Sequence, residues 1–472
     1  MHKPLRLGLR IGLGIGLSAV VGATGCSLGQ SFVQCQVDSD CPAQNATGQK
    51  LFCTQDNFCS VGTPASKLCT DIYPANSPSN AIVIGVLTNI DQGSDALPVL
   101  AFEQAIDEMN ALRVSTGDRQ FALHLCEISA TPDDPLKSMK ILARERGAVA
   151  VLGPSSSSFV LNIAPEVIAS QVPIMSQSAS SPAISDLPAP GLFFRTVPSD
   201  NLQGPPLAAQ LPLSAGKFDM MVVNDSYGTG LQQAFFKSTS KLPTLSLNYN
   251  ELGGTPAALT QAIQATAGQI VNDNPYPNYV IAITNNYTAQ VVQALQGLNS
   301  AAKIVMADGA KNQTLLNLSV TGNAATKMHL ARISGTAPTV DLNNTTGTGA
   351  YNQLLTTYQQ KWKQSAAVNN YISYSYDGAY AVGIAIAAAG NNVTPATVSQ
   401  MLLRMNGSSD RITVGATGYL MAKNKLANGG GITLQGATGN IRFTAHGDRD
   451  SGLYEVWSID TTTNTFKSVP AN

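Results

Sequence analysis

Hydroxyl and amide side chains follow several strongly apolar segments of this sequence. Four serines follow AVAVL in GPSSSS (153–158), and more serines follow VPIM in SQSASSP (176–182). The corresponding segments later in the chain are DSYGTG (225–230), TNNY (284–287) and DG (308–309). These side chains carry few charges but many hydrogen-bonding groups, which suits the binding of a small polar or zwitterionic molecule in a cleft.

Common catalytic and cofactor-binding motifs do not accompany these serines. After residue 80 no serine lies in a G-x-S-x-G elbow, and no Walker loop or G-x-G-x-x-G follows an apolar segment. The histidines beyond the amino-terminal segment are His124, His329 and His446, and their positions match no triad or metal-ligand spacing. We therefore expect a protein that is not an enzyme and that uses no metal or cofactor.

The segments that must position these side chains alternate between strands and helices from residue 81. AIVIGVL (81–87) is a β-branched run typical of a strand buried on both faces, and an apolar period near 3.6 residues over 95–112 predicts a helix. Further strands are predicted at 121–128, 148–153, 172–176, 218–224, 279–284 and 302–308. This order predicts an α/β protein with doubly wound parallel sheets, which bind ligands beyond the carboxyl ends of their strands. A long apolar helix is predicted at 371–388 and an antiparallel hairpin with a Gly-Asp turn at 440–460.

Several motifs resemble those of the branched-chain amino-acid-binding (Leu/Ile/Val-type) family of periplasmic solute receptors. They are VLGPSSSS, VPIMSQSASSPAISDL, FFRTVPSDNLQGPPLAAQL, VVNDSYGTGL and SYDGAYA, in family-like order and spacing over about 80–460. The resemblance implies the type I periplasmic-binding fold, in which two doubly wound parallel-sheet lobes are joined by a three-strand hinge and close on a ligand. The crossings are expected at 195–204, near 335–343 and after about 401.

The resemblance also implies residues that hold the carboxylate of an amino-acid ligand. Ser157 and Ser180 match the family's hydroxyl positions, and Ser178 matches a neighbour that offers backbone groups. Backbone amides and a hydroxyl at a helix start suit an anion. Ser157 has an alternative interpretation as a simple helix cap.

Other ligand-binding residues are implied in the second lobe. Tyr227 matches a tyrosine that faces the ligand, Asp308 an acid that pairs with the ligand's ammonium group, and Asn285 a loop that contacts the ligand's side chain. Tyr227 has the alternative of packing on the lobe surface, and Asp308 of capping a helix.

The amino terminus has the features of an export signal. Residues 1–10 carry three basic side chains and no acid, and 11–25 are uncharged and apolar but too short to cross a bilayer. The run ends on Ala-Thr-Gly-Cys, which resembles the lipobox of bacterial lipoproteins, and this predicts lipidation of Cys26. The alternative is ordinary signal cleavage with Cys26 as a free thiol.

The other six cysteines predict disulfides, because the count is even and the chain is expected to be exported. They are Cys35, Cys41, Cys53, Cys59, Cys69 and Cys126. The first four lie in a polar segment that is too poor in apolar residues to fold around a core, so we expect a small disulfide-held knob. A zinc cluster is the weaker alternative, since the spacings are not CxxC-like and no histidine is near. We expect the last two cysteines to pair with each other.

These observations predict four regions. We expect a lipoprotein signal peptide at 1–25, a cysteine-rich knob and linker at 26–78, an N-terminal lobe at 79–200 plus about 336–400, and a C-terminal lobe at 201–335 plus about 401–465.

Composition and resemblance together predict the function class. The 472 residues have a net charge of -1 and only 12% charged side chains, which disfavours nucleic acid as a partner. We expect a lipid-anchored protein of the cell envelope that binds an amino acid or similar small zwitterion, with an ABC permease as its partner. The knob and the insertions near 340–350 and 411–431 leave the alternative of a sensory or protein-interaction module on the same fold.

Overall fold

A computed structural model describes residues 42, 51–53, 59–61, 68–89, 93–128, 134–212, 214–251, 255–340, 349–407 and 409–471. The chain divides into two compact units, Met1–Gly62 and Thr63–Asn472. Among the described residues no helix is long and apolar enough to span a bilayer.

The first unit contains one antiparallel pair of strands, β1 (Leu51–Cys53) and β2 (Cys59–Val61), in which Cys53 and Cys59 are register partners. The signal segment and the cysteines at 26, 35 and 41 lie outside the described residues.

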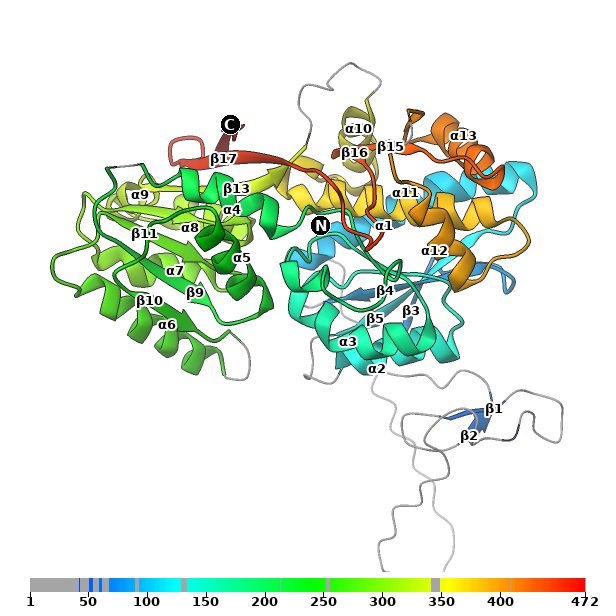
Figure 1. The fold of residues 1–472 in the computed structure, drawn as a ribbon, viewed down its shortest axis with the longest axis horizontal. Helices are drawn as coiled ribbons and strands as arrows, with labels where there is room; N and C mark the ends of the chain where they lie inside the picture. Colours follow the sequence, from blue (N-terminus) through cyan, green and yellow to red (C-terminus); the bar gives the residue numbers. More distant parts are fainter. Residues whose placement is uncertain are drawn as a thin grey trace, which may run out of the picture. The chain divides into compact units, whose positions relative to one another are not determined.

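The first lobe of the second unit is built on a six-stranded sheet of order β3-β5-β4-β6-β7-β8 (Figure 1). Only the edge strand β3 is antiparallel to its neighbour. The strands are β3 (Asp71–Tyr73), β4 (Ile82–Thr88), β5 (Phe121–Glu127), β6 (Val151–Leu152), β7 (Ile174–Ser176) and β8 (Phe193–Arg195). The predicted disulfide between Cys69 and Cys126 is confirmed, and it ties the entry of β3 to β5.

Helices cover both faces of this sheet, as the sequence of β4 requires. Ile82, Ile84 and Val86 lie in a core with α1 and α11, whereas Leu87 lies in a second core with α2 and α3. Successive side chains of a strand point to opposite faces, so a continuous apolar run is buried on both. The helices are α1 (Gly93–Thr116), α2 (Asp134–Lys140, continued by a π-helical turn to Glu145), α3 (Ser157–Ser170), α10 (Ala350–Trp362) and α11 (Asn370–Ala389).

The second lobe has a seven-stranded sheet of order β10-β9-β11-β12-β13-β17-β18. Its strands are β9 (Phe218–Val223), β10 (Ser246–Tyr249), β11 (Tyr279–Ile283), β12 (Lys303–Met306), β13 (Ile333–Thr339), β17 (Leu453–Asp460) and β18 (Thr465–Pro470). The helices are α4 (Asp200–Ala209), α5 (Ser226–Lys237), α6 (Pro256–Val271), α7 (Thr288–Ala294), α8 (Gln313–Thr321) and α9 (Ala324–Leu330). The strands from β9 to β13 are parallel, and β17 returns antiparallel to β13.

The segment after residue 394 differs from the expected lobe boundary. It forms α12 (Pro395–Leu403), α13 (Ala416–Ala427) and a three-stranded sheet of β14 (Arg411–Thr413), β15 (Thr433–Gly436) and β16 (Gly439–Ile441). Ile412, Tyr419 and Leu434 share the first lobe's core with Ile84. This segment therefore packs on the first lobe, because its apolar residues gather around α11, and only β17 and β18 return to the second lobe.

The chain passes between the lobes three times, at 196–199, between β13 and α10, and at 442–452. The third crossing lies later than the sequence suggested, and it replaces the predicted hairpin. A turn at Gly447 is present, but β16 pairs with β15 in the first lobe while β17 pairs with β13 and β18 in the second.

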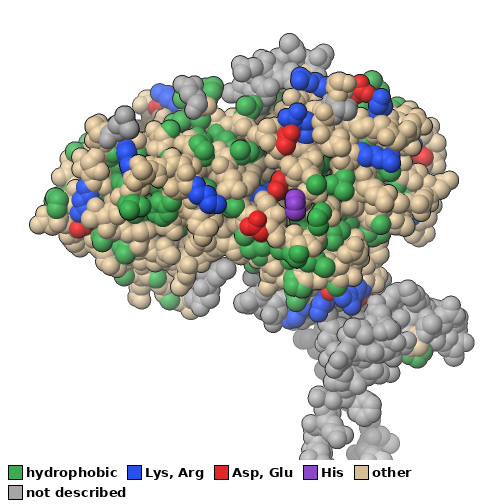
Figure 2. Space-filling model, viewed as in Figure 1, with side chains coloured by type: hydrophobic (Ala, Val, Ile, Leu, Met, Phe, Trp, Pro, Cys, Tyr) green, Lys and Arg blue, Asp and Glu red, His purple; other side chains and the backbone are tan. Residues whose placement is uncertain are grey.

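The first and third crossings are held together by a buried arginine. Arg449 pairs with Pro198 in a β-bridge and donates hydrogen bonds to the carbonyl oxygens of Thr196, at 3.1 Å, and Thr438, at 2.7 Å. Asp377 of α11 in turn accepts from the Thr438 amide at 2.8 Å. Asp377 of the SYDGAYA motif thus links the apolar helix α11 to the crossings. Charged side chains are sparse on the face shown in Figure 2, as expected from 12% charged residues.

Candidate functional site

The serine loop after β6 is held against β4. Gly153 has φ +84, and a Cβ there would lie 2.4 Å from the Leu87 carbonyl oxygen, so only glycine fits this turn. Ser157 then begins α3 with a side chain that is buried. Its hydroxyl oxygen accepts a hydrogen bond from the Ser181 amide at 3.1 Å. The hydroxyl proton of Ser157 is left to donate, at the electropositive end of a 14-residue helix.

The loop after β7 lies against the first serine loop. Ser178 donates its hydroxyl proton to the Ser155 carbonyl oxygen at 2.9 Å, so this side chain joins the two loops. The Ser180 side chain is buried, and its hydroxyl has no hydrogen-bond partner within the described residues. The structure thus brings Ser157 and Ser180 to one place and gives Ser178 a structural contact.

Arg195 of β8 holds the second loop in place. Its guanidinium donates to the carbonyl oxygen of Ser181 at 2.9 Å, to the hydroxyl of Ser185 at 2.8 Å and to the carboxylate of Asp448 at 2.7 Å. The side chain is fully buried, so these bonds satisfy a charge that would otherwise be costly. The arginine of the FRT segment therefore positions the loop that carries Ser180.

In the second lobe, Tyr227 and Asp308 are in direct contact. Tyr227 lies in the first turn of α5 and donates to Asp308 Oδ1 at 2.7 Å, and Gln203 of α4 donates to the same oxygen at 3.0 Å. Asp308 does not cap α8, because Asn312 does. Nor does Tyr227 pack on the lobe surface, since it is buried. Burial, the charge of Asp308 and that of Asp200 raise the pKa of Tyr227 well above its ordinary value.

Two more residues that the sequence did not single out complete this cluster. Tyr371, at the start of α11 in the first lobe, donates to Asp308 Oδ2. Asp200, in the first turn of α4, is 0% exposed, and neither of its carboxylate oxygens has a hydrogen-bond partner within the described residues. The Asp200 amide donates to the Ser180 carbonyl oxygen at 2.9 Å, which places Asp200 beside the serine loops. We call the set Ser157, Ser180, Asp200, Tyr227, Asp308 and Tyr371 the interlobe cluster.

The charge state of Asp200 is set by its surroundings. Burial raises the pKa of its carboxyl group well above 3.8, and the charge of Asp308 raises it further, while Ser180 and Arg195 oppose this rise. A fully buried carboxylate beside a second acid is strongly disfavoured relative to its neutral form. A cation bound beside Asp200 would therefore favour the ionised form of its carboxyl group.

Asn285 is held by a different buried acid. Its backbone amide donates to Glu251 Oε1 at 3.3 Å, and the amide of Asn286 donates to Oε2 at 3.0 Å. Tyr249 donates to the same carboxylate at 2.9 Å. No hydrogen bond in the described part of the chain joins Asn285 to Asp200 or Asp308. The structure thus gives Asn285 a backbone contact with Glu251, and its predicted role toward a ligand stays a prediction.

The lobes also touch through the two helix starts. Ser158 of α3 accepts from the Ser226 amide of α5 and donates to its hydroxyl, both at 3.3 Å. The interlobe cluster thus lies between loops at the carboxyl ends of strands from both sheets, which is where α/β folds bind ligands.

Two α/β lobes joined by three crossings, with buried polar groups between them, define a type I periplasmic-binding fold. A profile of the family described as "Receptor family ligand binding region" matches residues 97–462, and the chain belongs to this family. None of the curated proteins matches it in sequence.

Solved structures of low sequence identity share the fold. The isoleucine-bound LivJ, a branched-chain amino acid transporter substrate-binding protein from Streptococcus pneumoniae, is 13% identical, with a TM-score of 0.61, over 83% of this chain and 99% of LivJ. The leucine-binding protein LivK from Thermotoga maritima is 15% identical, with a TM-score of 0.60, over 83% and 99%. A benzoate-bound solute-binding protein of an ABC transporter from R. palustris is 12% identical, with a TM-score of 0.60, over 83% and 95%.

Proposed function

We propose that this protein is an envelope-anchored solute-binding lipoprotein that captures an amino acid or similar small zwitterion between its lobes for an ABC-type transporter. The observation that carries the proposal is Asp200, a fully buried carboxyl group whose oxygens make no hydrogen bond of ordinary geometry within the described residues, and whose pKa is raised by burial and by the charge of Asp308. Two neighbouring acids in a low-dielectric place favour a ligand that brings a positive charge.

The same cluster offers a complementary place for a carboxylate. Ser157 begins α3, whose first-turn amides and dipole favour negative charge, and the loop that carries Ser180 lies against it through the Ser181 amide. The serine loops belong to the first lobe and Asp308 and Tyr227 to the second, so a zwitterion would join the lobes by its two opposite charges. Asp200 follows the first crossing, where its carboxylate can pair with the ligand's ammonium group together with Asp308.

The transport role and the anchor have separate support. Structural neighbours include substrate-binding proteins of ABC transporters that hold isoleucine or benzoate. The anchor is inferred from Cys26 after a short apolar segment.

One observation favours the alternative of a sensory or protein-interaction module. Asp308 already accepts hydrogen bonds from Tyr227, Gln203 and Tyr371. A cluster that satisfied itself in this way would need no solute, although the Asp200 carboxyl group makes no hydrogen bond of ordinary geometry within the described residues.

A thermal-shift screen of the exported chain, with Cys26 replaced, tests the proposal. The panel contains the amino acids and benzoate-type acids. A ligand at about 100 times its Kd should stabilise the fold by about 2.7 kcal/mol. We expect one amino acid to raise the Tm, Asp200→Asn and Ser180→Ala each to abolish the shift, and Asp186→Asn, at an exposed site, to leave it unchanged. A cooperative transition that no panel member shifts would favour the interaction module.

A further inference from the structure

A cavity lies in the first lobe, away from the interlobe cluster. It has a volume of about 620 Å³ and lies between the edge strand β3 and the helix α1. None of the residues that line it belongs to the interlobe cluster. This volume is in the range of cavities that hold small organic ligands, about 300–1,000 Å³.

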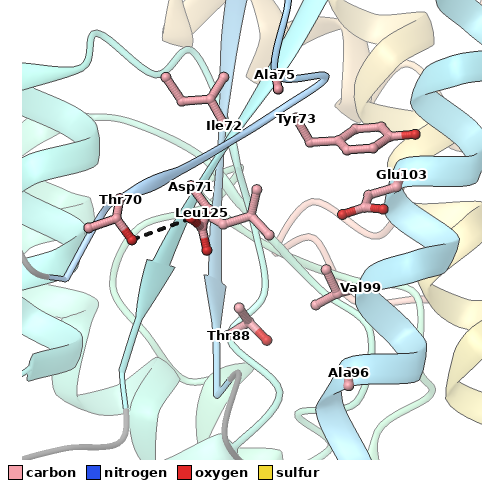
Figure 3. Close-up of a pocket in the computed structure, with 10 residues that line it drawn as sticks. All are labelled: Thr70, Asp71, Ile72, Tyr73, Ala75, Thr88, Ala96, Val99, Glu103 and Leu125. Carbon is pink, nitrogen blue, oxygen red and sulfur yellow. Dashed lines mark hydrogen bonds between the residues drawn. The ribbon is translucent and has the colours of Figure 1, made fainter. Parts of the chain in front are cut away.

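The walls combine apolar side chains with two carboxylates (Figure 3). From α1, the side chains at 96, 99 and 103 line one wall, because residues three and seven positions apart share a helix face. The opposite wall comes from Asp71 and Tyr73 of β3, Leu125 of β5 and Thr88 at the end of β4.

Glu103 is the charged group with the fewest partners in this cavity. Its side chain is half-buried and makes no hydrogen bond in the described part of the chain. Burial raises the pKa of Glu103 to about 7, Lys361 opposes the rise, and Asp107 adds to it. Lys361 is itself bound to Asp107, and Tyr73 donates to Asp107 at 2.7 Å, so the lysine's charge is already compensated.

The Tyr73 ring stands opposite Glu103 in Figure 3. An aromatic face attracts cations, and Lys361 Nζ lies 5.4 Å from the centroid of this ring. The cavity therefore presents a carboxylate and an aromatic ring above the aliphatic side chains of Val99 and Leu125. Asp71 adds a second negative charge near the opening, where it accepts from the Thr70 hydroxyl.

We infer that this cavity is a binding site for a small organic ammonium compound with a short apolar tail. The ammonium group pairs with Glu103, and the tail packs on Val99, Leu125 and Ala96. The Cys69–Cys126 disulfide holds the wall, since Cys69 lies two residues before Asp71 and Cys126 directly after Leu125. This inference does not depend on the proposed function.

Titration of the exported chain with pentylammonium and with its neutral counterpart 1-pentanol tests the site, with ligand-observed NMR and a thermal shift as readouts. The measurement is made at about pH 8, above the pKa of about 7, so that Glu103 is ionised. We expect pentylammonium to bind at least about tenfold more tightly than pentanol, because a charge-assisted hydrogen bond contributes at least that factor. Glu103→Gln should remove this preference.

Two further variants make the result unambiguous. Ala96→Leu projects three more carbon atoms from an exposed helix position into the wall on which the tail packs, keeps every charge and should weaken binding of both compounds. Asp200→Asn in the interlobe cluster, and Asp186→Asn on the surface, should leave pentylammonium binding unchanged. Absence of binding to the unaltered chain, equal binding of pentanol, or loss of binding in Asp200→Asn would each overturn the inference.

Discussion

Tyr371 donates a hydrogen bond to Asp308 across the two lobes. Tyr371 is the second residue of α11, whose next residues belong to the first lobe's core, whereas Asp308 follows β12 of the second lobe. The neighbouring Asn370 donates to the carbonyl oxygen of Pro338 at 2.7 Å, so the start of α11 is attached to the second lobe at two points. The helix α11, which contacts the crossings, is therefore also bonded to Asp308 between the lobes.

Replacing Tyr371 by phenylalanine should weaken this attachment. The change removes one donor from Asp308 and leaves the ring in place, so we expect the free energy of unfolding to fall by about 1.5–3 kcal/mol. Chemical denaturation measures the difference. Tyr276→Phe is the matched control, because Tyr276 is 54% exposed and its replacement should change the stability by less than about 0.5 kcal/mol. Equal stability of the two variants would show that the Tyr371–Asp308 bond contributes nothing.

Asp200 should make the ligand-free protein less stable as the pH rises. Its pKa in the folded state lies above the ordinary 3.8, so between these two values the folded chain binds more protons than the unfolded chain. Stability from this group is thus fully present below pH 3.8 and is lost as the pH rises toward the raised pKa. Relative to Asp200→Asn, we expect the unaltered chain to lose up to about 1.4 kcal/mol per pH unit in this window. Parallel stability curves for the two proteins would contradict this assignment.

The affinity for an ammonium-bearing ligand should increase as the pH rises, whereas the stability of the ligand-free protein decreases. The ligand pairs with ionised Asp200, so binding below the raised pKa must release one proton. We expect Kd to increase about tenfold for each pH unit of acidification in that window, measured by calorimetry in buffers of different ionisation enthalpy. A pH-independent Kd for the unaltered chain would mean that the ligand does not ionise Asp200.

The sequence singled out the members of the interlobe cluster that follow strands, and it did not single out Asp200 or Tyr371. Ser157, Ser180, Tyr227 and Asp308 each follow a buried strand by a few residues, and the family resemblance of the segments that carry them singled them out. Asp200 was missed because an acid after Ser199 at a helix start has the same pattern as an ordinary first-turn acid, and only burial distinguishes it.

Long-range contacts account for the remaining differences. Tyr371 lies in an apolar run that predicted a helix, but no pattern in the neighbouring sequence indicates that the start of this helix contacts Asp308. The segment from 411 to 441 contains short strands and one helix, whose lobe is decided by packing around α11 rather than by its own periodicity. The sharp turn at Gly447 indicated a hairpin, yet the strands on either side find better partners in different sheets.

Removing the Cys69–Cys126 disulfide should lower stability and loosen the wall of the cavity between β3 and α1. The bond closes a loop with a sequence separation of 57 residues and ties the edge strand β3 to β5. Replacing both cysteines by alanine should lower the free energy of unfolding by about 2–5 kcal/mol. Treating the unaltered chain with a thiol reductant should also lower its free energy of unfolding, whereas the double variant has no disulfide at this site to reduce. Pentylammonium affinity should fall with the loss of the bond, because the disulfide reinforces the three register pairs that join β3 to β5. If the double variant kept both its stability and its pentylammonium affinity, the disulfide would support neither the fold nor the cavity.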